Sequence, residues 1–206
     1  MSRPLQSVPR PTSTPSPSPT CSRVDPDLGH QTSVNALRVF RGVCRSCPLL
    51  TTCVDRDLSS KPDASVLGGL TDTERAALFY AEQAGDRADR AQAATLLEPW
   101  WVGKLRYAAK TCLTLDEVTT TIGRVENRPV SRGTIRLALW WSGIDVPMVA
   151  HGTHGPAHVV ATQHRDFVSA LTAAHAPDTT IADLLGVHVL SIRRAHVLAT
   201  ETKDAA

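Results

Sequence analysis

Four of the five cysteines lie toward the N-terminal end of the chain, at Cys21, Cys44, Cys47 and Cys53. Cys44 and Cys47 form a C-x2-C pair, which places two sulfur atoms on one turn of the chain, and the flanking cysteines can complete a four-sulfur shell. A disulfide framework is not expected in a chain that stays in a reducing compartment. The spacing therefore favours an iron–sulfur cluster or a zinc ion.

Three other interpretations stay open at this point. Zinc ribbons generally use two C-x2-C pairs, and this chain has one, so zinc fits the spacing less well than a cluster. Cys44 and Cys47 also have the spacing of a thiol–disulfide oxidoreductase, although no βαβ pattern surrounds them. The last interpretation is four unligated thiols.

The elements that position these cysteines are predicted by turn and capping residues. Gly68 and Gly69 indicate a turn with positive φ angles. Thr71 and Glu74 have the spacing of a helix-capping box, which predicts a helix through Phe79. A short helix is expected over residues 34–40.

Together these residues resemble the WhiB-like family of actinobacterial and actinophage regulators. The resemblance covers residues 21 to about 78 and rests on Cys21 with Val24-Asp25-Pro26-Asp27-Leu28, on Cys44-Arg45-Ser46-Cys47-Pro48 with Cys53, and on Val66-Leu67-Gly68-Gly69-Leu70-Thr71 with Glu74-Arg75. Members of this family are transcription factors. The resemblance implies that Cys21, Cys44, Cys47 and Cys53 hold a [4Fe–4S] cluster that responds to oxygen or nitric oxide.

The resemblance also implies a protein partner. Several family members bind the C-terminal region of the principal sigma factor, and the turn formed by Val66, Leu67, Gly68 and Gly69 is the expected contact. The family usually has Trp where this chain has Leu67. Most members are short and end in a small basic tail, whereas this chain continues into a long extension without a basic run.

The extension ends in a segment with the layout of a helix-turn-helix, over residues 178–195. Ala182 allows close helix crossing, Gly186 permits the turn, and Ile192 is expected to pack the second helix against the first. Asp178 or Thr179 is the expected N-cap. The residues predicted to contact DNA here are His188, Arg193 and Arg194, while a plain helical hairpin is the alternative.

A second, looser helical pair is expected upstream. Thr114 begins a short helix that Gly123 should end, and a second helix follows Ser131. Residues 100–145 contain seven basic and four acidic residues, so this module is locally basic. Arg132 and Arg136 are therefore predicted to contact DNA, with an ordinary helical bundle as the alternative.

The remaining residues with chemical potential are assigned structural roles. Core positions are expected for Trp100, Trp101, Trp140 and Trp141. Cys112 is expected to be a buried apolar thiol, and the histidines at 151, 154 and 158 are expected to lie in a linker.

Composition and punctuation predict a mainly α-helical chain of several small modules. The chain has 206 residues, 42% hydrophobic residues and a formal net charge of +2, with no apolar run long enough to cross a membrane and no signal peptide. The expected modules are a disordered Ser/Thr/Pro-rich tail (1–20), a WhiB-like [4Fe–4S] domain (21–80), a polar linker or helix (81–98), a basic helical module (99–150) and a helix-turn-helix-like module (157–200). A cytoplasmic location follows from these features.

The function expected from the sequence is a redox- or nitric-oxide-responsive transcriptional regulator that contacts DNA and a sigma factor. The alternatives are a thiol–disulfide oxidoreductase using Cys44 and Cys47, and a zinc-stabilised DNA-binding protein. No phosphate-binding loop, HExxH motif or nucleophile elbow is present, so hydrolysis and phosphoryl transfer have no motif to support them, and no enzymatic activity is expected.

Overall fold

A computed structural model describes residues 19–23, 33–58, 66–147 and 155–204. The described chain is mainly α-helical, as predicted, and its strands form one short hairpin. The elements are η1 (Thr20–Arg23), α1 (Val34–Arg45), α2 (Leu50–Leu58), β1 (Val66–Leu67), β2 (Leu70–Thr71), α3 (Asp72–Gln83), α4 (Arg90–Thr95), α5 (Pro99–Thr111), α6 (Leu115–Glu126), α7 (Arg132–Ser142), α8 (Pro156–Gln163), α9 (Arg165–Ala173), α10 (Asp178–Leu185) and α11 (Val189–Asp204). None of the helices in the described part of the chain is long and apolar enough to cross a membrane.

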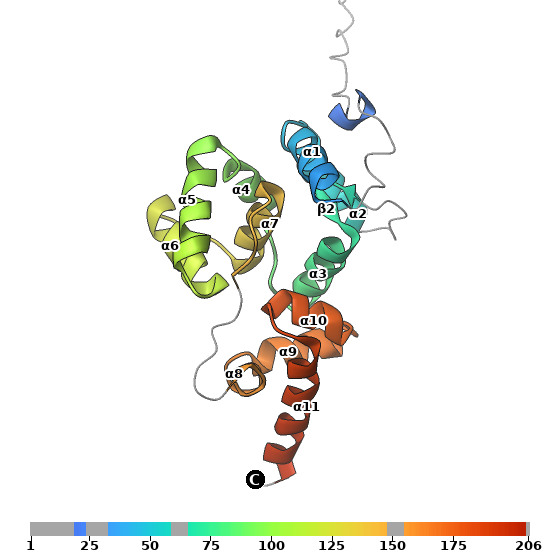
Figure 1. Cartoon of the computed structure of the whole chain (residues 1–206), viewed down its shortest axis with the longest axis vertical. Helices are drawn as coiled ribbons and strands as arrows, with labels where there is room; N and C mark the ends of the chain where they lie inside the picture. The colour runs from blue at the N-terminus through green and yellow to red at the C-terminus, as the bar shows by residue number, and fades with distance from the viewer. Residues whose placement is uncertain (1–18, 24–32, 59–65, 148–154, 205–206) are drawn as a thin grey trace, which may run out of the picture.

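The helices form two groups, each with its own hydrophobic core. Helices α1 to α7 make the larger group, and α8 to α11 make the smaller group, from which α11 projects toward the C-terminus (Figure 1). Helix α3 serves both cores, because Leu78 is buried in the first while Ala77 and Ala81 are buried in the second.

The larger core does not follow the predicted module boundaries. It runs from Phe40 to Trp141, so residues 21–80, 81–98 and 99–150 share one core instead of standing apart. Residues 81–98, predicted as an exposed polar linker or helix, contain the helix α4, but the predicted exposure is wrong because Ala93 and Leu96 are fully buried. The small apolar side chains of α4 allow it to pack closely against α7.

The glycine turn forms as predicted. β1 and β2 pair antiparallel with Leu67 opposite Leu70, so Gly68 and Gly69 are the two loop residues. Their φ values of +55° and +74° suit the two-residue hairpin loop that matches strand twist. A side chain at Gly68 would also collide with Val54, since a Cβ there would lie 2.7 Å from Val54 Cγ2.

Helix α3 begins with the predicted capping box. The Thr71 hydroxyl accepts a hydrogen bond from the Glu74 N–H at 3.2 Å, and the Glu74 carboxylate accepts one from the Thr71 N–H at 2.9 Å. Two of the N–H groups left unpaired at the helix start are thereby satisfied. This cap joins the glycine turn rigidly to α3.

Two predicted helix boundaries are wrong. Gly123 does not end its helix: α6 continues to Glu126 and ends at Asn127, which has a left-handed φ of +55°. Gly123 instead allows a close approach of the following chain, because a Cβ there would lie 3.3 Å from the Arg128 carbonyl oxygen. Helix α10 begins after Pro177, and neither Asp178 nor Thr179 is its N-cap.

The four tryptophans have different environments, although all were predicted to be core residues. Trp141 is fully buried, which confirms the prediction for that residue. Trp101 and Trp140 are partly buried at the edge of the core. Trp100 is 57% exposed, so its core prediction is wrong.

Candidate functional site

The four N-terminal cysteines lie on adjacent elements. Cys21 is exposed on η1, and Cys44 is buried in the last turn of α1. Cys47 lies in the connection to α2, and Cys53 lies on α2. None of the five cysteines, all of which belong to described residues, is in a disulfide bond.

The thiols of Cys21, Cys47 and Cys53 each lie within electrostatic reach of Cys44. The pKa of Cys44 is raised to about 12, and burial is the largest cause. The thiols of Cys53, Cys21 and Cys47 also contribute to this rise, while a hydrogen bond from the Gly69 backbone opposes it. In the conformation that the structure describes, no group of three or more His, Cys, Asp or Glu side chains is arranged tightly enough to hold a metal ion.

Several hydrogen-bond donors surround the Cys47 thiol. The Thr20 backbone N–H lies 3.4 Å from Cys47 Sγ. Burial raises the pKa of Cys47, but hydrogen bonds from the Thr20 backbone, the Leu49 backbone and the Thr20 side chain outweigh burial and leave that pKa below its ordinary value. The contact with Thr20 also keeps η1, and therefore Cys21, beside the α1–α2 connection.

The glycine turn packs directly against the Cys44 side chain. A Cβ at Gly69 would lie 3.3 Å from Cys44 Cβ and 3.2 Å from Trp141 Cδ1, so the turn fits between these two side chains only because residue 69 is glycine. Arg41 Nε donates to the Gly69 carbonyl at 3.1 Å, and the Arg41 guanidinium also binds the Glu74 carboxylate. The turn is thus held against α1 by an arginine of that helix.

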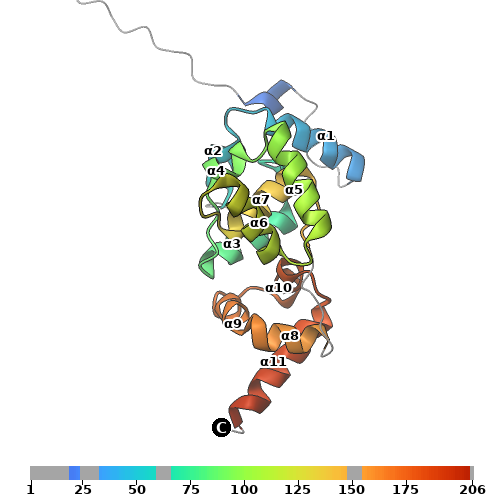
Figure 2. The same cartoon turned by 90° about the vertical axis from the view of Figure 1, so that its left-hand side faces the viewer.

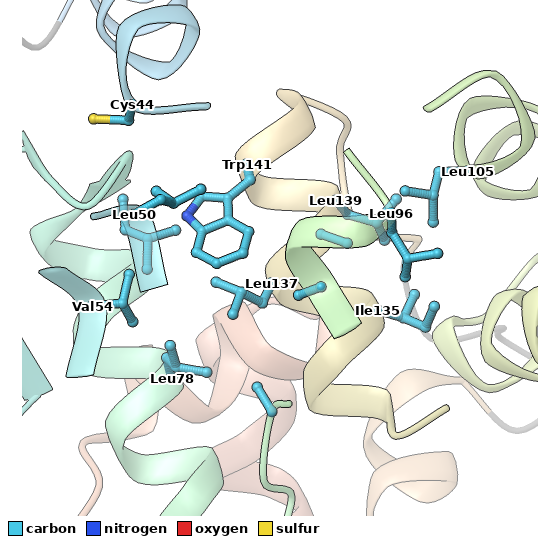
Figure 3. Close-up of a cluster of buried hydrophobic side chains, with 14 of the residues drawn as sticks. Cys44, Leu50, Val54, Leu78, Leu96, Leu105, Ile135, Leu137, Leu139 and Trp141 are labelled. Carbon is cyan, nitrogen blue, oxygen red and sulfur yellow. The ribbon is translucent and has the colours of Figure 1, made fainter. Parts of the chain in front are cut away.

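A hydrogen bond from Trp141 of α7 links the glycine turn to the part of the chain that follows α3. The Trp141 Nε1–H donates to the Gly68 carbonyl at 2.7 Å, across 73 positions of the sequence. Figure 3 shows the Trp141 ring in the middle of the larger core, with Leu50 and Val54 on one side and Leu96 and Leu139 on the other. Trp141 was predicted to be a core residue, but no local pattern in the sequence signals its hydrogen bond to Gly68.

This packing leaves little of the predicted sigma-contact turn exposed. Val66, Gly68 and Gly69 are buried, and Leu67 is partly exposed. A partner could reach the turn at Leu67 alone unless α7 moved away. Sigma binding at this turn stays a prediction.

The prediction that Arg136 contacts DNA is wrong. Arg136 is fully buried, and its guanidinium donates to the Asp86 carboxylate at 2.7 Å. The other Asp86 oxygen accepts from the Gly133 N–H at 2.7 Å. Sequence reasoning missed Asp86, because an acid fifty positions from Arg136 leaves no local signal.

Arg132 is also engaged within the protein. Its Nε lies 3.0 Å from an Asp116 carboxylate oxygen, and its guanidinium lies over the Phe167 ring at 5.2 Å. The Arg132 side chain is 29% exposed. Its main contacts therefore join α7 to α6 and α9.

The residues predicted to contact DNA in α11 are exposed. Helix α10 ends at Gly186, which has a left-handed φ of +62°, and Ile192 is fully buried in the smaller core. Arg193 and Arg194 both face solvent, although Arg193 Nε lies 3.6 Å from Asp178. His188 is exposed ahead of α11, where its Nδ1 accepts from the Leu190 N–H.

The other candidate residues lie apart from the cysteine site. Cys112 is partly exposed rather than buried, and its sulfur lies 3.7 Å from the Thr121 hydroxyl. His158 is exposed on α8. The histidines at 151 and 154, residues 1–18 of the tail and the segment Val24–Leu28 fall outside the described residues.

The N-terminal part of the chain matches a known family. Residues 16–78 match the family model described as Transcription factor WhiB. No curated protein and no solved structure matches the chain. The match contains all four N-terminal cysteines and the glycine turn, and it ends within α3.

Proposed function

Residues 16–78 of this chain are WhiB-like, and from that premise we propose that the protein is a redox- or nitric-oxide-responsive transcriptional regulator. Cys21, Cys44, Cys47 and Cys53 hold a [4Fe–4S] cluster, and α11 contacts DNA. The observation that carries the proposal is that the free thiols of Cys21, Cys47 and Cys53 lie within electrostatic reach of Cys44, beside a glycine turn that packs on Cys44.

The donor set suits an iron–sulfur cluster. Four thiolates are the ligands that such clusters use, and N–H groups directed at the sulfurs stabilise their negative charge. Thr20 supplies such a donor to Cys47, and Gly69 supplies one to Cys44. The bound cluster supplies a cross-link among the four thiolates that oxygen or nitric oxide can remove.

This ligand set would join elements that few other contacts connect. Cys21 belongs to η1, while the other three cysteines belong to α1, α2 and their connection, so binding all four fixes η1 against the module. Cys44 contacts the glycine turn, which is capped into α3, and α3 packs against α10. Loss of the cluster can therefore shift the C-terminal helices through the glycine turn and α3.

The thiol–disulfide oxidoreductase is the weaker alternative. The attacking thiol of such an enzyme must be accessible and must ionise readily. Cys47 is partly exposed and its pKa lies below the ordinary value, but Cys44, its partner in the C-x2-C pair, is 7% exposed and has a pKa raised to about 12. The burial of Cys44 therefore disfavours thiol–disulfide exchange through this pair. A zinc-stabilised DNA-binding protein would use the same four thiolates and is separated from the cluster by analysis of the metal.

The DNA contact rests on the exposed cationic face of α11. Arg193 and Arg194 extend into solvent from the helix that follows the Gly186 turn, where guanidinium groups can reach phosphates or guanine edges. Ile192 and Ala195 hold the opposite face against the rest of the module. Changes at the two arginines therefore leave the core intact.

Anaerobic purification of the full chain, with visible absorption and analysis of iron, sulfide and zinc, tests the cluster. Cys21→Ser is the most informative variant, because Cys21 is exposed and its replacement does not disturb the core. We expect the wild type to contain iron and sulfide in equal amounts and Cys21→Ser to lose them. Cys112→Ser is the matched control and should keep both.

Each contrary result points to a specific alternative. Zinc without sulfide in the wild type would replace the cluster with the zinc-stabilised protein. Equal iron and sulfide in Cys21→Ser and Cys112→Ser would remove Cys21 from the ligand set. A metal-free wild type with a reversible Cys44–Cys47 disulfide would favour the oxidoreductase.

A further inference from the structure

One face of α5 has large aromatic side chains exposed to solvent. Trp100 is 57% exposed and Tyr107 is 67% exposed, whereas Leu105 and Ala108 on the opposite face are buried. Trp100, Gly103, Lys104 and Tyr107 follow one another at the spacing i, i+3, i+4 and i+7, so they lie on the same side of the helix. Figure 2 turns the α5–α6 side of the molecule toward the viewer.

These four residues enclose a hollow on the surface. Its volume is about 490 Å³, and Pro99 contributes the remaining wall. Gly103 forms the floor, and a Cβ placed there would meet nothing within 4 Å. Four side-chain positions at this spacing form the hole that receives a single side chain of a facing helix in knobs-into-holes packing.

The hollow is preorganised by contacts among its own residues. Lys104 Nζ lies over the Trp100 ring at 5.3 Å from the centroid, and Trp101 packs edge-on against Trp100 at 4.6 Å between centroids. These contacts hold the Trp100 ring in place before a partner arrives, which lowers the entropic cost of binding.

The positive charge of α5 favours an acidic partner. The helix carries Lys104, Arg106 and Lys110 and no acidic residue. Pairing α5 with the α5 of a second copy would bring six positive charges together, so a homodimer through this face is opposed. The Lys104 ammonium over the Trp100 ring also covers the ring surface that a stacked base would need.

We propose that this face of α5 docks an acidic amphipathic helix of a partner protein, which inserts an apolar side chain between Trp100 and Tyr107. Acidic residues beside that side chain pair with Lys104 and Lys110. Aromatic and arginine side chains are the residue types that most often dominate the affinity of protein interfaces.

Two synthetic peptides probe this site. Each has about three heptads with Leu at the a and d positions, and they carry either Glu or Lys at the e and g positions. Fluorescence anisotropy of the labelled peptides is measured against the full chain. We expect saturable binding of the Glu peptide and at least about tenfold weaker binding of the Lys peptide.

Gly103→Leu fills the hollow without endangering the fold, because the position is open and leucine favours helix more than glycine does. This variant and Tyr107→Ala should each weaken binding of the Glu peptide by about tenfold or more. Leu113→Ala is the matched control, since Leu113 is 68% exposed but lies outside the hollow, and it should bind like the wild type.

Three results would overturn the proposal. They are Glu-peptide binding that Gly103→Leu leaves unchanged, equal binding of the two peptides, and no saturable binding of the Glu peptide. Binding of a single-stranded oligonucleotide that Trp100→Ala abolishes, without peptide binding, would assign the face to nucleic acid instead.

Discussion

The arginines of α7 and α11 occupy opposite environments, although both helices were expected to contact DNA. Arg136 is fully buried on Asp86, and Arg132 is paired with Asp116 and stacked on Phe167. Arg193 and Arg194 of α11 are exposed. A local excess of basic residues is therefore not enough to predict a nucleic-acid surface. Acidic residues from other parts of the sequence can pair with the arginines and take them out of contact with solvent.

The difference between the two helices arises from packing. Helix α7 lies at the centre of the larger group, against α1, α3, α4 and α6, so most of its side chains are buried. Helix α11 packs against α8 and α10 and leaves one side to solvent. The arginines of α7 therefore form ion pairs within the protein, whereas the arginines of α11 are exposed and can contact a ligand.

The largest expected effect on stability is that of Asp86→Ala. This change removes the carboxylate that pairs with the buried Arg136 guanidinium and accepts the Gly133 N–H. An unpaired buried charge should lower the free energy of unfolding by about 4 kcal/mol. Urea denaturation followed by circular dichroism measures the change.

Asp116→Ala is the matched control, because Asp116 pairs with Arg132 but is 53% exposed. It should lower the free energy of unfolding by less than about 1 kcal/mol. If Asp86→Ala were no more destabilising than Asp116→Ala, Arg136 would not need its partner, and the contrast between buried and exposed arginines would fail.

Ile192→Ala tests the packing that presents α11. Ile192 of α11 is fully buried in the smaller core, so its truncation should leave a cavity there. We expect a loss of about 3 kcal/mol in the free energy of unfolding of the smaller group. Val197→Ala on the same helix, where Val197 is 54% exposed, should change it by less than about 0.5 kcal/mol.

Trp141→Phe tests the link between the extension and the glycine turn. Phenylalanine retains most of the buried ring but cannot donate to the Gly68 carbonyl, which is left buried without this donor. The expected loss in the free energy of unfolding is about 2 kcal/mol. Trp100→Phe, at an exposed position, should have almost no effect, and a similar effect of the two changes would contradict the assigned role of this hydrogen bond.

Local patterns predicted the features that depend on local chemistry. The Gly68–Gly69 turn, the capping box of Thr71 and Glu74, and the turn at Gly186 all formed, because φ preference and helix capping act over a few residues. The packing of Ile192 also followed from helical spacing. Cys21, Cys47 and Cys53 lie within electrostatic reach of Cys44, and their role as a set of cluster ligands stays a prediction.

Features that depend on distant residues were not predictable in this way. The Arg136–Asp86 pair spans 50 positions and the Trp141–Gly68 hydrogen bond spans 73, so neither leaves a periodic or compositional signal. The same reason explains residues 81–98, whose polar composition suggested a linker while their few alanines and leucines enter the shared core. Gly123 was misjudged because glycine can serve a close chain approach as well as a helix end.

The double variant Arg193→Ala/Arg194→Ala should have the smallest effect on stability, because both side chains are exposed. Its free energy of unfolding should differ from that of the wild type by no more than about 0.5 kcal/mol. Removal of Arg193 also removes its long contact with Asp178, which is itself partly exposed and contributes little. A large destabilisation would assign these arginines a structural role like that of Arg136.

Binding of the anaerobically purified full chain to mixed-sequence duplex DNA, at several salt concentrations, tests the central claim most directly. If α11 is the DNA-contacting helix, the double variant should bind more weakly, and the slope of log affinity against log salt should shrink by about 0.9 for each lost phosphate contact. Arg132→Ala should leave both quantities nearly unchanged. Equal affinity and slope for the folded double variant and the wild type would contradict the account.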